Sequence, residues 1–407
     1  MNEENKILVG IDVGTTETRC LIAQPADSKK NNIRIIGFGR AENTGFRKGT
    51  VVNINETAQS IDSAVAAAEK IAGVSIDGAT LSINGGHIVS ESSKGVIAVG
   101  ANHEIDEDDI FRAQDAAASV RIGNNQTLLQ VSPRVYTLDG QEGIRDPRGM
   151  VGMRLELDAL LTNVSTQSLR NLEKAVEVAK LNVHQFITPA VAGATAILTR
   201  QQSEHGVLYV DIGASTTNIA VYEEGDLQYV AVIPVGSAHI TNDLAIGLRT
   251  DIDLAESIKI NHVDLSMGAD KKKSNLEIVI NNQKHTFRYK DIDLVVRARM
   301  EEIAAMINDE LAKINRNGKL PGGIVLAGGG AKLKGISQFL SAELKLPASV
   351  ATVPSFVGVS EEVKDLNCAA LLGLTLMDGE QDAENSSGRK AKAGKIGGAL
   401  KNLFKKR

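Results

Sequence analysis

The sequence predicts an α/β protein of two related halves, with a small α+β insertion in the first half. The first observation is a strand-turn-strand pattern that occurs twice, around Asp12 and again around Asp211. The second is a buried strand followed by three glycines at residues 328–330. The third is a long interruption, from about residue 85 to 163, that has strands and a helix of its own. Together they predict two similar sheets that share one ligand site.

Each copy of the repeated pattern is an apolar strand that ends in Asp-x-Gly, then small hydroxyl residues, then a second apolar strand. The predicted phosphate loops are Gly14-Thr15-Thr16 and Gly213-Ala214-Ser215-Thr216. Glycine lets the backbone come close to a phosphate, and successive N–H groups in a tight turn form an anion nest. Asp12 and Asp211 would face Mg²⁺, directly or through water, because hard cations prefer oxygen. One such hairpin is equally compatible with an ordinary turn, whereas two copies favour loops that hold a nucleotide from both sides.

The glycine motif follows the apolar run at residues 324–327, and its members are Gly328, Gly329 and Gly330. Glycines at the end of a buried strand permit close backbone approach to a nucleoside or phosphate. A helix that starts there favours negative charge at its N-terminus. From the residues alone, this motif is therefore predicted to approach either the nucleoside or a phosphate of the ligand.

The remaining patterns give the order of elements. In the first half they predict strands at 6–24, 33–39 and 79–83, with helices at 55–72 and 166–180. The insertion is predicted to contain strands at 95–99, 127–138 and 151–161 and a helix at 106–120. Two small-residue helices, 189–198 and 367–376, are expected to pack closely as a pair. Residues 251–320 are expected to hold helices and a strand pair at 276–280 and 286–288.

Composition limits the functional classes. The chain has 407 residues, 43% of them hydrophobic, which is ordinary for a globular protein. It contains no apolar run of 18 residues, so no membrane-spanning helix is expected. Cys20 and Cys368 are expected to be buried free thiols. The last 19 residues carry eight basic side chains and no acid, which leaves 37 basic and 50 acidic residues elsewhere. An acidic body with a basic tail does not indicate a nucleic-acid-binding protein.

The C-terminal region predicts a membrane anchor. Residues 379–394 are polar and rich in Gly and Ser, so we expect a flexible linker. On a helix over 395–407, one face would carry the apolar residues and the other the basic ones. The predicted membrane-binding residues are Ile396, Leu400, Leu403, Phe404, Lys401, Lys405 and Lys406. One such tail should bind an anionic membrane weakly, whereas many tails on one polymer would bind tightly. A solvated basic tail is the alternative.

The order of the two phosphate motifs and the glycine motif resembles the actin, sugar-kinase and chaperone superfamily. Within it, the chain resembles the FtsA family of bacterial cell-division proteins. The segments that carry this resemblance are Gly45–Asn53, Asn84–Ile88, Tyr136–Met150, Gly236–Ala245 and Ala255–Lys259. It implies an actin-like ATPase fold, with two ribonuclease-H-like halves and an inserted α+β subdomain. The expected subdomains are 1A (1–84 and 164–205), 1C (85–163), 2A (206–247 and 321–378) and 2B (248–320).

The resemblance also implies roles. Glu256 and Lys259, with the three glycines at 328–330, would hold the adenosine. From the sequence alone, an exposed ion pair three residues apart on a helix is the favoured interpretation of Glu256 and Lys259. Thr188 stands where chaperones of the superfamily carry a glutamate that orients water, so we expect at most slow ATP hydrolysis. The implied partners are the C-terminal peptide of the tubulin-like protein FtsZ on 2B, late division membrane proteins on 1C, further copies of the chain in filaments, and an anionic membrane.

The expected role is therefore an ATP- and Mg²⁺-binding protein that polymerises on the cytoplasmic face of the cell membrane at the division site and anchors the FtsZ ring. One alternative is an adaptor of the PilM type from a type IV pilus machine, a family that lacks a basic tail on a long linker. A second is a small-molecule kinase or phosphatase of the same superfamily. Such an enzyme needs a further catalytic carboxylate, and the sequence offers none beyond Asp12 and Asp211.

Overall fold

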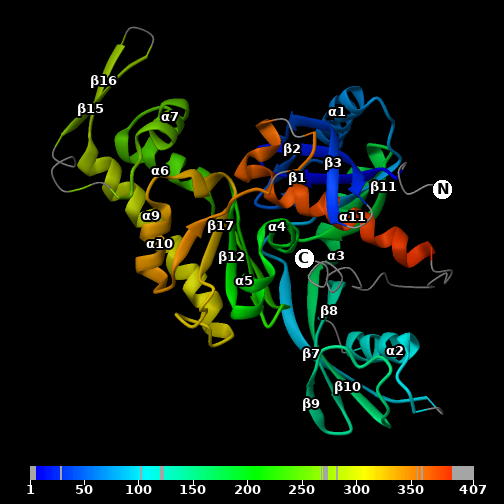
Figure 1. The fold of residues 1–407 in the computed structure, drawn as a ribbon. Coiled ribbons are helices and arrows are strands. Elements are labelled where there is room, and N and C mark those ends of the chain that lie inside the picture. The colour runs from blue at the N-terminus through cyan, green and yellow to red at the C-terminus, as the bar shows by residue number, and fades with distance from the viewer. Residues whose placement is uncertain are drawn as a thin grey trace.

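The computed structural model describes residues 6–27, 30–100, 103–119, 123–266, 268, 274–280, 283–354, 356–358 and 361–386. Two five-stranded sheets, one in each lobe, form the body of the molecule (Figure 1). Their strand orders are β3-β2-β1-β6-β11 and β14-β13-β12-β17-β18. In both sheets the first three strands are antiparallel and the last two join in parallel. The two halves therefore share one ribonuclease-H-like topology, as the repeated pattern predicts.

The first lobe is subdomain 1A. Its sheet contains β1 (Leu8–Val13), β2 (Glu17–Asp27), β3 (Lys30–Glu42), β6 (Gly78–Ser82) and β11 (Asn182–Ile187). A short pair, β4 (Phe46–Arg47) and β5 (Thr50–Val51), precedes α1 (Ile54–Ala72). Asn53 caps α1 by accepting hydrogen bonds from two backbone N–H groups of its first turn. The helix buries Ile61, Val65 and Ala68, which recur at the predicted spacing. The other helices of 1A are α3 (Thr166–Val178), α4 (Pro189–Ile197) and α5 (Arg200–His205).

Helices α4 and α11 (Ala369–Ser386) cross at close range between the two sheets. A Cβ atom built on Gly373 of α11 would lie 1.7 Å from the backbone oxygen of Ala192 in α4. The two backbones can approach this closely only because the crossing point lacks a side chain. The predicted pairing of the two small-residue helices is therefore confirmed.

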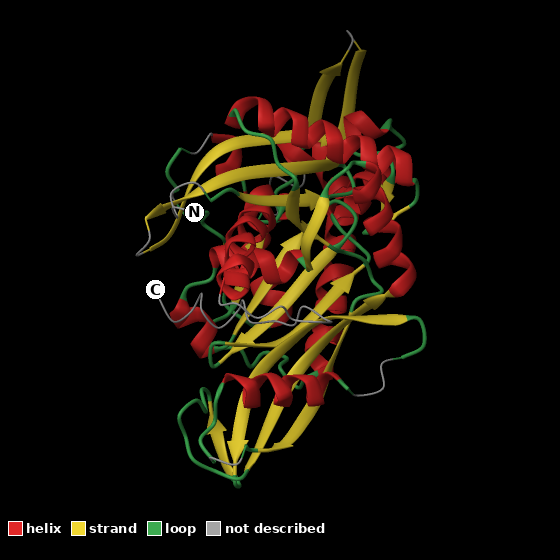
Figure 2. Cartoon of the chain, turned by 90° about the vertical axis from the view of Figure 1, so that its right-hand side faces the viewer, coloured by secondary structure: helices red, strands yellow, loops and turns green. Residues whose placement is uncertain are grey.

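Subdomain 1C projects from the first lobe as a four-stranded sheet with α2 on one face (Figure 2). Its elements are β7 (Val89–Ala98), α2 (Glu107–Ala118), β8 (Gln126–Leu138), β9 (Gln141–Ile144) and β10 (Arg154–Ser165). Asp106 and Asp109 form a capping box at the start of α2. A small separate core beneath α2 includes Leu155, Leu157 and Tyr136.

The second lobe combines the 2A sheet with the helices of 2B. The sheet contains β12 (Val207–Ile212), β13 (Thr217–Glu223), β14 (Asp226–Ile233), β17 (Ile324–Ala327) and β18 (Ala348–Val350). Its helices are α6 (Ser237–Leu248), α7 (Ile252–His262), α9 (Tyr289–Lys313), α10 (Ile336–Leu344) and the 3-10 turns η2 (Gly329–Lys332), η3 (Glu361–Lys364) and η4 (Leu366–Cys368). The hairpin β15 (Asn275–Ile280) and β16 (Gln283–Arg288) projects from 2B (Figure 1).

The structure differs from the sequence expectations at several places, including these three. Strand β7 begins at Val89, six residues before the predicted start, because a polar edge strand pairs through its backbone and needs no apolar alternation. The hairpin strand β9 was not predicted. After the three glycines the chain forms a 3-10 turn, and the α-helix begins only at Ile336.

The predicted linker is wrong at its start, because α11 continues through Ser386. Ala, Glu and Gln at 380–384 are good helix formers, and extending an existing helix needs no new nucleus. The predicted membrane-binding helix over 395–407 lies outside the described residues. Within the described part of the chain, no helix has the length and apolar character needed to cross a bilayer. Cys20 and Cys368 are both buried and free.

Candidate functional site

The two predicted phosphate loops lie at corresponding ends of the two sheets and face each other. Each closes with the same turn hydrogen bond, from Gly14 N to Glu17 O at 3.1 Å and from Gly213 N to Thr216 O at 2.9 Å. Between the lobes, Thr15 Oγ1 lies 2.5 Å from Ser215 Oγ. Thr16, at the outer side of the first loop, is exposed. Phosphates bound between the loops would therefore replace a hydroxyl-to-hydroxyl contact that now joins them.

The second loop is supported from behind by the start of α6. The backbone N–H groups of Ser237 and Ala238 donate to the carbonyl oxygens of Gly213 and Ala214 at 2.9 and 2.8 Å. A Cβ on Gly236 would lie 2.6 Å from the first of these oxygens. The loop is therefore held against α6 with no room for a side chain between them.

Asp12 and Asp211 come at equivalent positions, each one residue before the end of its strand. Burial raises the pKa of both carboxyl groups, and the nearby Arg19 guanidinium partly opposes this for Asp12. For Asp211 the pKa rises to about 7, through burial first and then through the negative charge of Asp12. Two deeply placed carboxyl groups within electrostatic reach of each other suit a cation between them.

A magnesium ion fits this pair. Among the described residues, the charges of Asp12 and Arg19 act on the Asp211 carboxyl group and no hydrogen bond does, so its oxygens remain available to a cation or its water shell. Mg²⁺ commonly binds one or two carboxylates and completes its shell with water and phosphate oxygens. In the described part of the chain, no group of three or more His, Cys, Asp or Glu side chains could hold a metal by itself. The phosphates of a nucleotide would therefore supply the remaining ligands.

Arg19 is a site residue that the sequence analysis missed. It pairs with Asp12 in the β1–β2 register, whereas Asn218 takes the matching position opposite Asp211. Its Nη1 lies 3.8 Å from Asp12 Oδ2 and donates to the backbone oxygen of Asn367 at 3.2 Å. Comparing the two copies position by position would have revealed this charge, because only the first copy carries one there.

The three predicted nucleoside glycines have different surroundings. A Cβ on Gly328 would lie 2.2 Å from Asp211 Oδ1, and one on Gly330 would lie 2.3 Å from Ile212 Cγ2. Both are buried, so packing against β12 already requires glycine there. Gly329 is exposed and is the member of the three best placed to touch a ligand.

Glu256 and Lys259 form the ion pair that the sequence also allowed, but it is only partly exposed, because the Lys259 side chain is 10% exposed and the Glu256 side chain 43%. Lys259 is buried, and its Nζ donates to Thr241 Oγ1 at 2.9 Å and to Glu256 Oε2 at 2.7 Å. It also lies 3.4 Å from the backbone oxygen of Ser237, at the helix start that supports the second phosphate loop. Lys259 therefore links the predicted nucleoside residues to the predicted phosphate residues.

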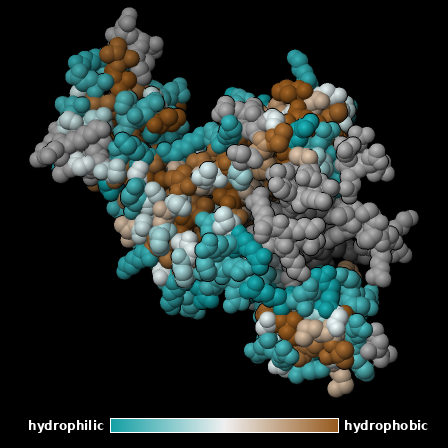
Figure 3. All heavy atoms as spheres, viewed as in Figure 1, coloured by the Kyte–Doolittle hydropathy of each residue, from teal (hydrophilic) through white to brown (hydrophobic). Residues whose placement is uncertain are grey.

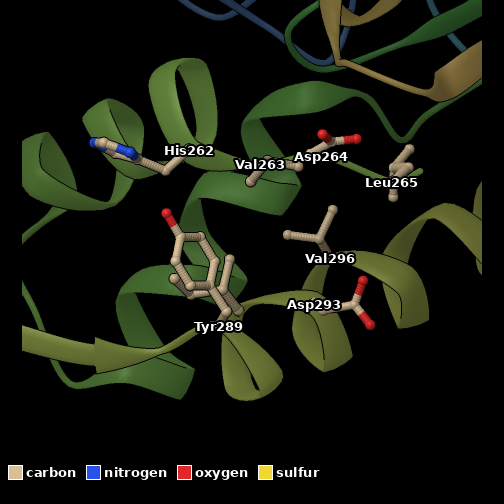
Figure 4. Close-up of a pocket in the computed structure, with 8 residues that line it drawn as sticks. His262, Val263, Asp264, Leu265, Tyr289, Asp293 and Val296 are labelled. Carbon is tan, nitrogen blue, oxygen red and sulfur yellow. The ribbon is translucent and has the colours of Figure 1, made fainter. Parts of the chain in front are cut away.

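Subdomain 2B has a small pocket of its own, between the end of α7 and α9 (Figure 4). Its walls are mainly apolar. Its two carboxylates are already paired, Asp264 with Lys334 at 3.0 Å and Asp293 with Arg297 at 2.8 Å. The pocket contains none of the predicted nucleotide residues.

Comparison with known proteins identifies the family. The family model described as cell division protein FtsA matches residues 208–373, and the model described as the SHS2 domain inserted in FtsA matches residues 85–162. Cell division protein FtsA of Bacillus subtilis is 33% identical over 88% of this chain and 81% of its own length. The chain belongs to the FtsA family of cell-division proteins. The FtsA protein of Borreliella burgdorferi is 31% identical over 98% of both chains.

Solved structures support the actin-like fold. The type IV pilus biogenesis complex PilM–PilN aligns with a TM-score of 0.65 at 15% identity, covering 91% of this chain and 98% of that chain. MreB5 of Spiroplasma citri bound to ADP aligns with a TM-score of 0.55 at 11% identity, covering 95% of this chain and 100% of that chain. At such low identities these likenesses show the fold alone. The pilus-adaptor alternative is therefore supported only by the shared fold, whereas the FtsA assignment is supported by sequence identity over most of the chain.

Proposed function

We propose that this FtsA-family protein binds ATP and Mg²⁺ between its lobes and uses the bound nucleotide to set a conformation that assembles into filaments. The observation that carries this proposal is the pair of matching loops whose hydroxyls, Thr15 Oγ1 and Ser215 Oγ, meet at 2.5 Å. MreB5 structures of the same fold contain ADP and AMPPNP, which supports a nucleotide in this cleft.

The roles follow from the surroundings of each group. The backbone and hydroxyls of Gly14, Thr15, Thr16 and of Gly213–Thr216 would bind phosphate, and Asp12 and Asp211 would hold Mg²⁺ through water. Gly329, Glu256 and Lys259 would contact the nucleoside. Thr188 is 1% exposed, and its hydroxyl is buried without a partner among the described residues. No carboxylate stands at that position to orient water, so ATP hydrolysis would be slow.

We further propose that 2B receives the C-terminal peptide of FtsZ. Large apolar side chains are exposed on two helices of 2B, at Ile260 on α7 and Leu294 on α9, and on the neighbouring helix α6 of 2A, at Ile246; their exposed fractions are 67%, 68% and 77%. Figure 3 shows apolar surface on 2B interrupting a hydrophilic background. Exposed apolar side chains on neighbouring helices suit a peptide partner.

The basic amphipathic pattern of residues 395–407 would attach the filament to the cytoplasmic face of the membrane at the division site. Late division membrane proteins would dock on 1C, where Val151 and Met153 are 73% and 66% exposed.

The test of the membrane anchor is co-sedimentation with anionic vesicles in the presence of ATP, comparing the full chain with a chain ended at Gly388. We expect only the full chain to pellet. Equal pelleting of both would remove the anchor.

Two further measurements address the rest of the proposal. Equilibrium dialysis with MgATP should show that the full chain binds ATP and that Lys259→Met loses this binding, with Lys284→Met on the projecting hairpin as the control.

A binding assay should favour the FtsZ C-terminal peptide over the N-terminal peptide of a pilus partner. The opposite preference would favour the pilus-adaptor role, and rapid phosphotransfer to small molecules would favour the kinase.

A further inference from the structure

Subdomain 1C belongs to the first lobe in sequence, but it docks on the edge strand of the second lobe, β14. Ser90 Oγ donates to Val230 O at 2.6 Å and accepts from Val230 N at 3.2 Å. Arg134 Nη2 donates to Gln228 O at 2.8 Å, and its Nη1 pairs with Asp158 at 3.3 Å. Two side chains of 1C therefore hold the open edge of the 2A sheet by its backbone.

The contact between 1C and β14 buries a polar group that has no hydrogen-bond partner among the described residues. Arg134 Nε, on the side chain that reaches β14, is buried and has no partner among the described residues. Burial in 1C also lowers the pKa of the Arg134 guanidinium. Buried polar groups without partners oppose the burial, because undocking would return them to water. A modest interaction elsewhere can therefore shift the balance between docked and undocked 1C.

Asn84 connects the start of 1C to the second phosphate loop. Its Oδ1 accepts from Gly85 N at 2.7 Å, which fixes the orientation of the amide, and its Nδ2 donates to Thr216 Oγ1 at 3.1 Å. The next residue but one, Gly86, lies against Pro234, directly after β14. The Asn84 side chain thus joins the phosphate loop to the start of 1C, and Gly86 places the same short segment beside the end of the strand on which 1C docks.

We propose that Asn84 is a positioning residue that couples phosphate at Thr216 to the docking of 1C on β14. A hydroxyl has one donor and two acceptor sites, so Thr216 can donate to a phosphate oxygen while it still accepts from Asn84. Hydrogen bonds in such a chain strengthen each other. Bound ATP therefore favours the docked state. The inference rests on the proposed nucleotide site and adds a second task to it, which is to set the position of the inserted subdomain.

The experiment is hydrogen–deuterium exchange of the full chain with and without saturating MgATP, followed in peptides that cover 226–233. The amide of Val230 reports docking directly, because its hydrogen-bond acceptor is Ser90 in 1C. In the unsubstituted chain we expect ATP to slow exchange there by about threefold or more, within the usual range of coupling between sites. In Asn84→Ala this slowing should disappear although ATP still binds. Asn261→Ala, whose amide bonds only within α7, is the matched control.

Arg134→Ala provides a second test at the other end of the coupling. It should speed exchange at 226–233 in both states and, because coupling is reciprocal, weaken ATP binding about threefold or more. Arg112→Ala is its control, since Arg112 bonds only to residues of 1C. An ATP response that survives in Asn84→Ala, or is missing from the unsubstituted chain while ATP binds, overturns the coupling and leaves the proposed function intact. Absence of ATP binding by dialysis overturns both.

Discussion

Arg19 faces Asp12 across the first hairpin, with 3.8 Å between Nη1 and Oδ2, and both side chains are about 13–14% exposed. The second hairpin has no charge at the equivalent position, because Asn218 stands opposite Asp211. A guanidinium fixed beside a carboxylate and next to a phosphate loop can shift toward a phosphate oxygen when one arrives.

Replacing Arg19 by Met should therefore weaken ATP binding about tenfold, since a charge-assisted hydrogen bond contributes about 1.5–3 kcal/mol. Titration calorimetry would measure the change. Arg40→Met is the control, because that side chain is 60% exposed on the neighbouring strand and pairs with Glu362 at 3.6 Å. Equal affinities for the Arg19→Met variant and the unsubstituted protein would place Arg19 outside the binding site.

The raised pKa of Asp211 makes stability depend on pH. With its pKa raised to about 7, Asp211 keeps its proton in the folded protein up to about pH 7, whereas in the unfolded chain it has the ordinary pKa of an aspartate, 3.8. The folded state thus binds more protons between these limits, so the contribution of Asp211 to stability falls as pH rises from about 4 to 7.

The Asp211→Asn variant should accordingly be more stable than the unsubstituted protein at pH 8, by roughly 2–4 kcal/mol without nucleotide. The advantage should shrink as pH falls through 7 toward 4. Urea unfolding at pH 5 and pH 8 would measure it. A constant difference across this range would show that the carboxyl group is not the cause.

The close crossing of α4 and α11 predicts a large cost for Gly373→Ala. The added methyl group would collide with the backbone oxygen of Ala192, and neither helix can move without disturbing a sheet. We expect a loss of about 1–3 kcal/mol or more in the free energy of unfolding. Gly268→Ala, which meets no atom within 4 Å, should change stability little. A calorimetric melting curve for each variant would separate the two.

Asp378 on α11 should also be sensitive. Its side chain is 2% exposed and accepts hydrogen bonds from Val9 N at 2.8 Å and Thr80 Oγ1 at 2.7 Å, with His184 Nδ1 2.7 Å away. Asp378→Ala would leave buried donors unsatisfied and should cost roughly 2–4 kcal/mol. Asp378→Asn keeps an acceptor and should cost less. Denaturant midpoints that rank the two variants the other way would contradict this.

Much of the fold could be predicted from the sequence, because it depends on local patterns of residues. The repeated Asp-x-Gly hairpins predict two sheets of equal topology, and the small residues of 189–198 predict a close helix crossing. Contacts between distant segments are harder to foresee. Arg19 escaped notice since its role depends on a register partner, and the burial of Lys259 depends on Thr241 in another helix. The polar strand β7 escaped because its pairing uses backbone groups, which carry no side-chain signature.

Helix α11 connects the proposed membrane anchor to the contact between the two lobes. The same helix crosses α4 at the junction of the lobes, is fastened to the 1A sheet through Asp378, and continues to Ser386 toward the basic C-terminal segment. If that segment binds the membrane, a pull on it would act on the crossing of α4 and α11 between the two sheets instead of on a surface loop. A pull from the membrane and a movement between the two lobes would then both act on α11.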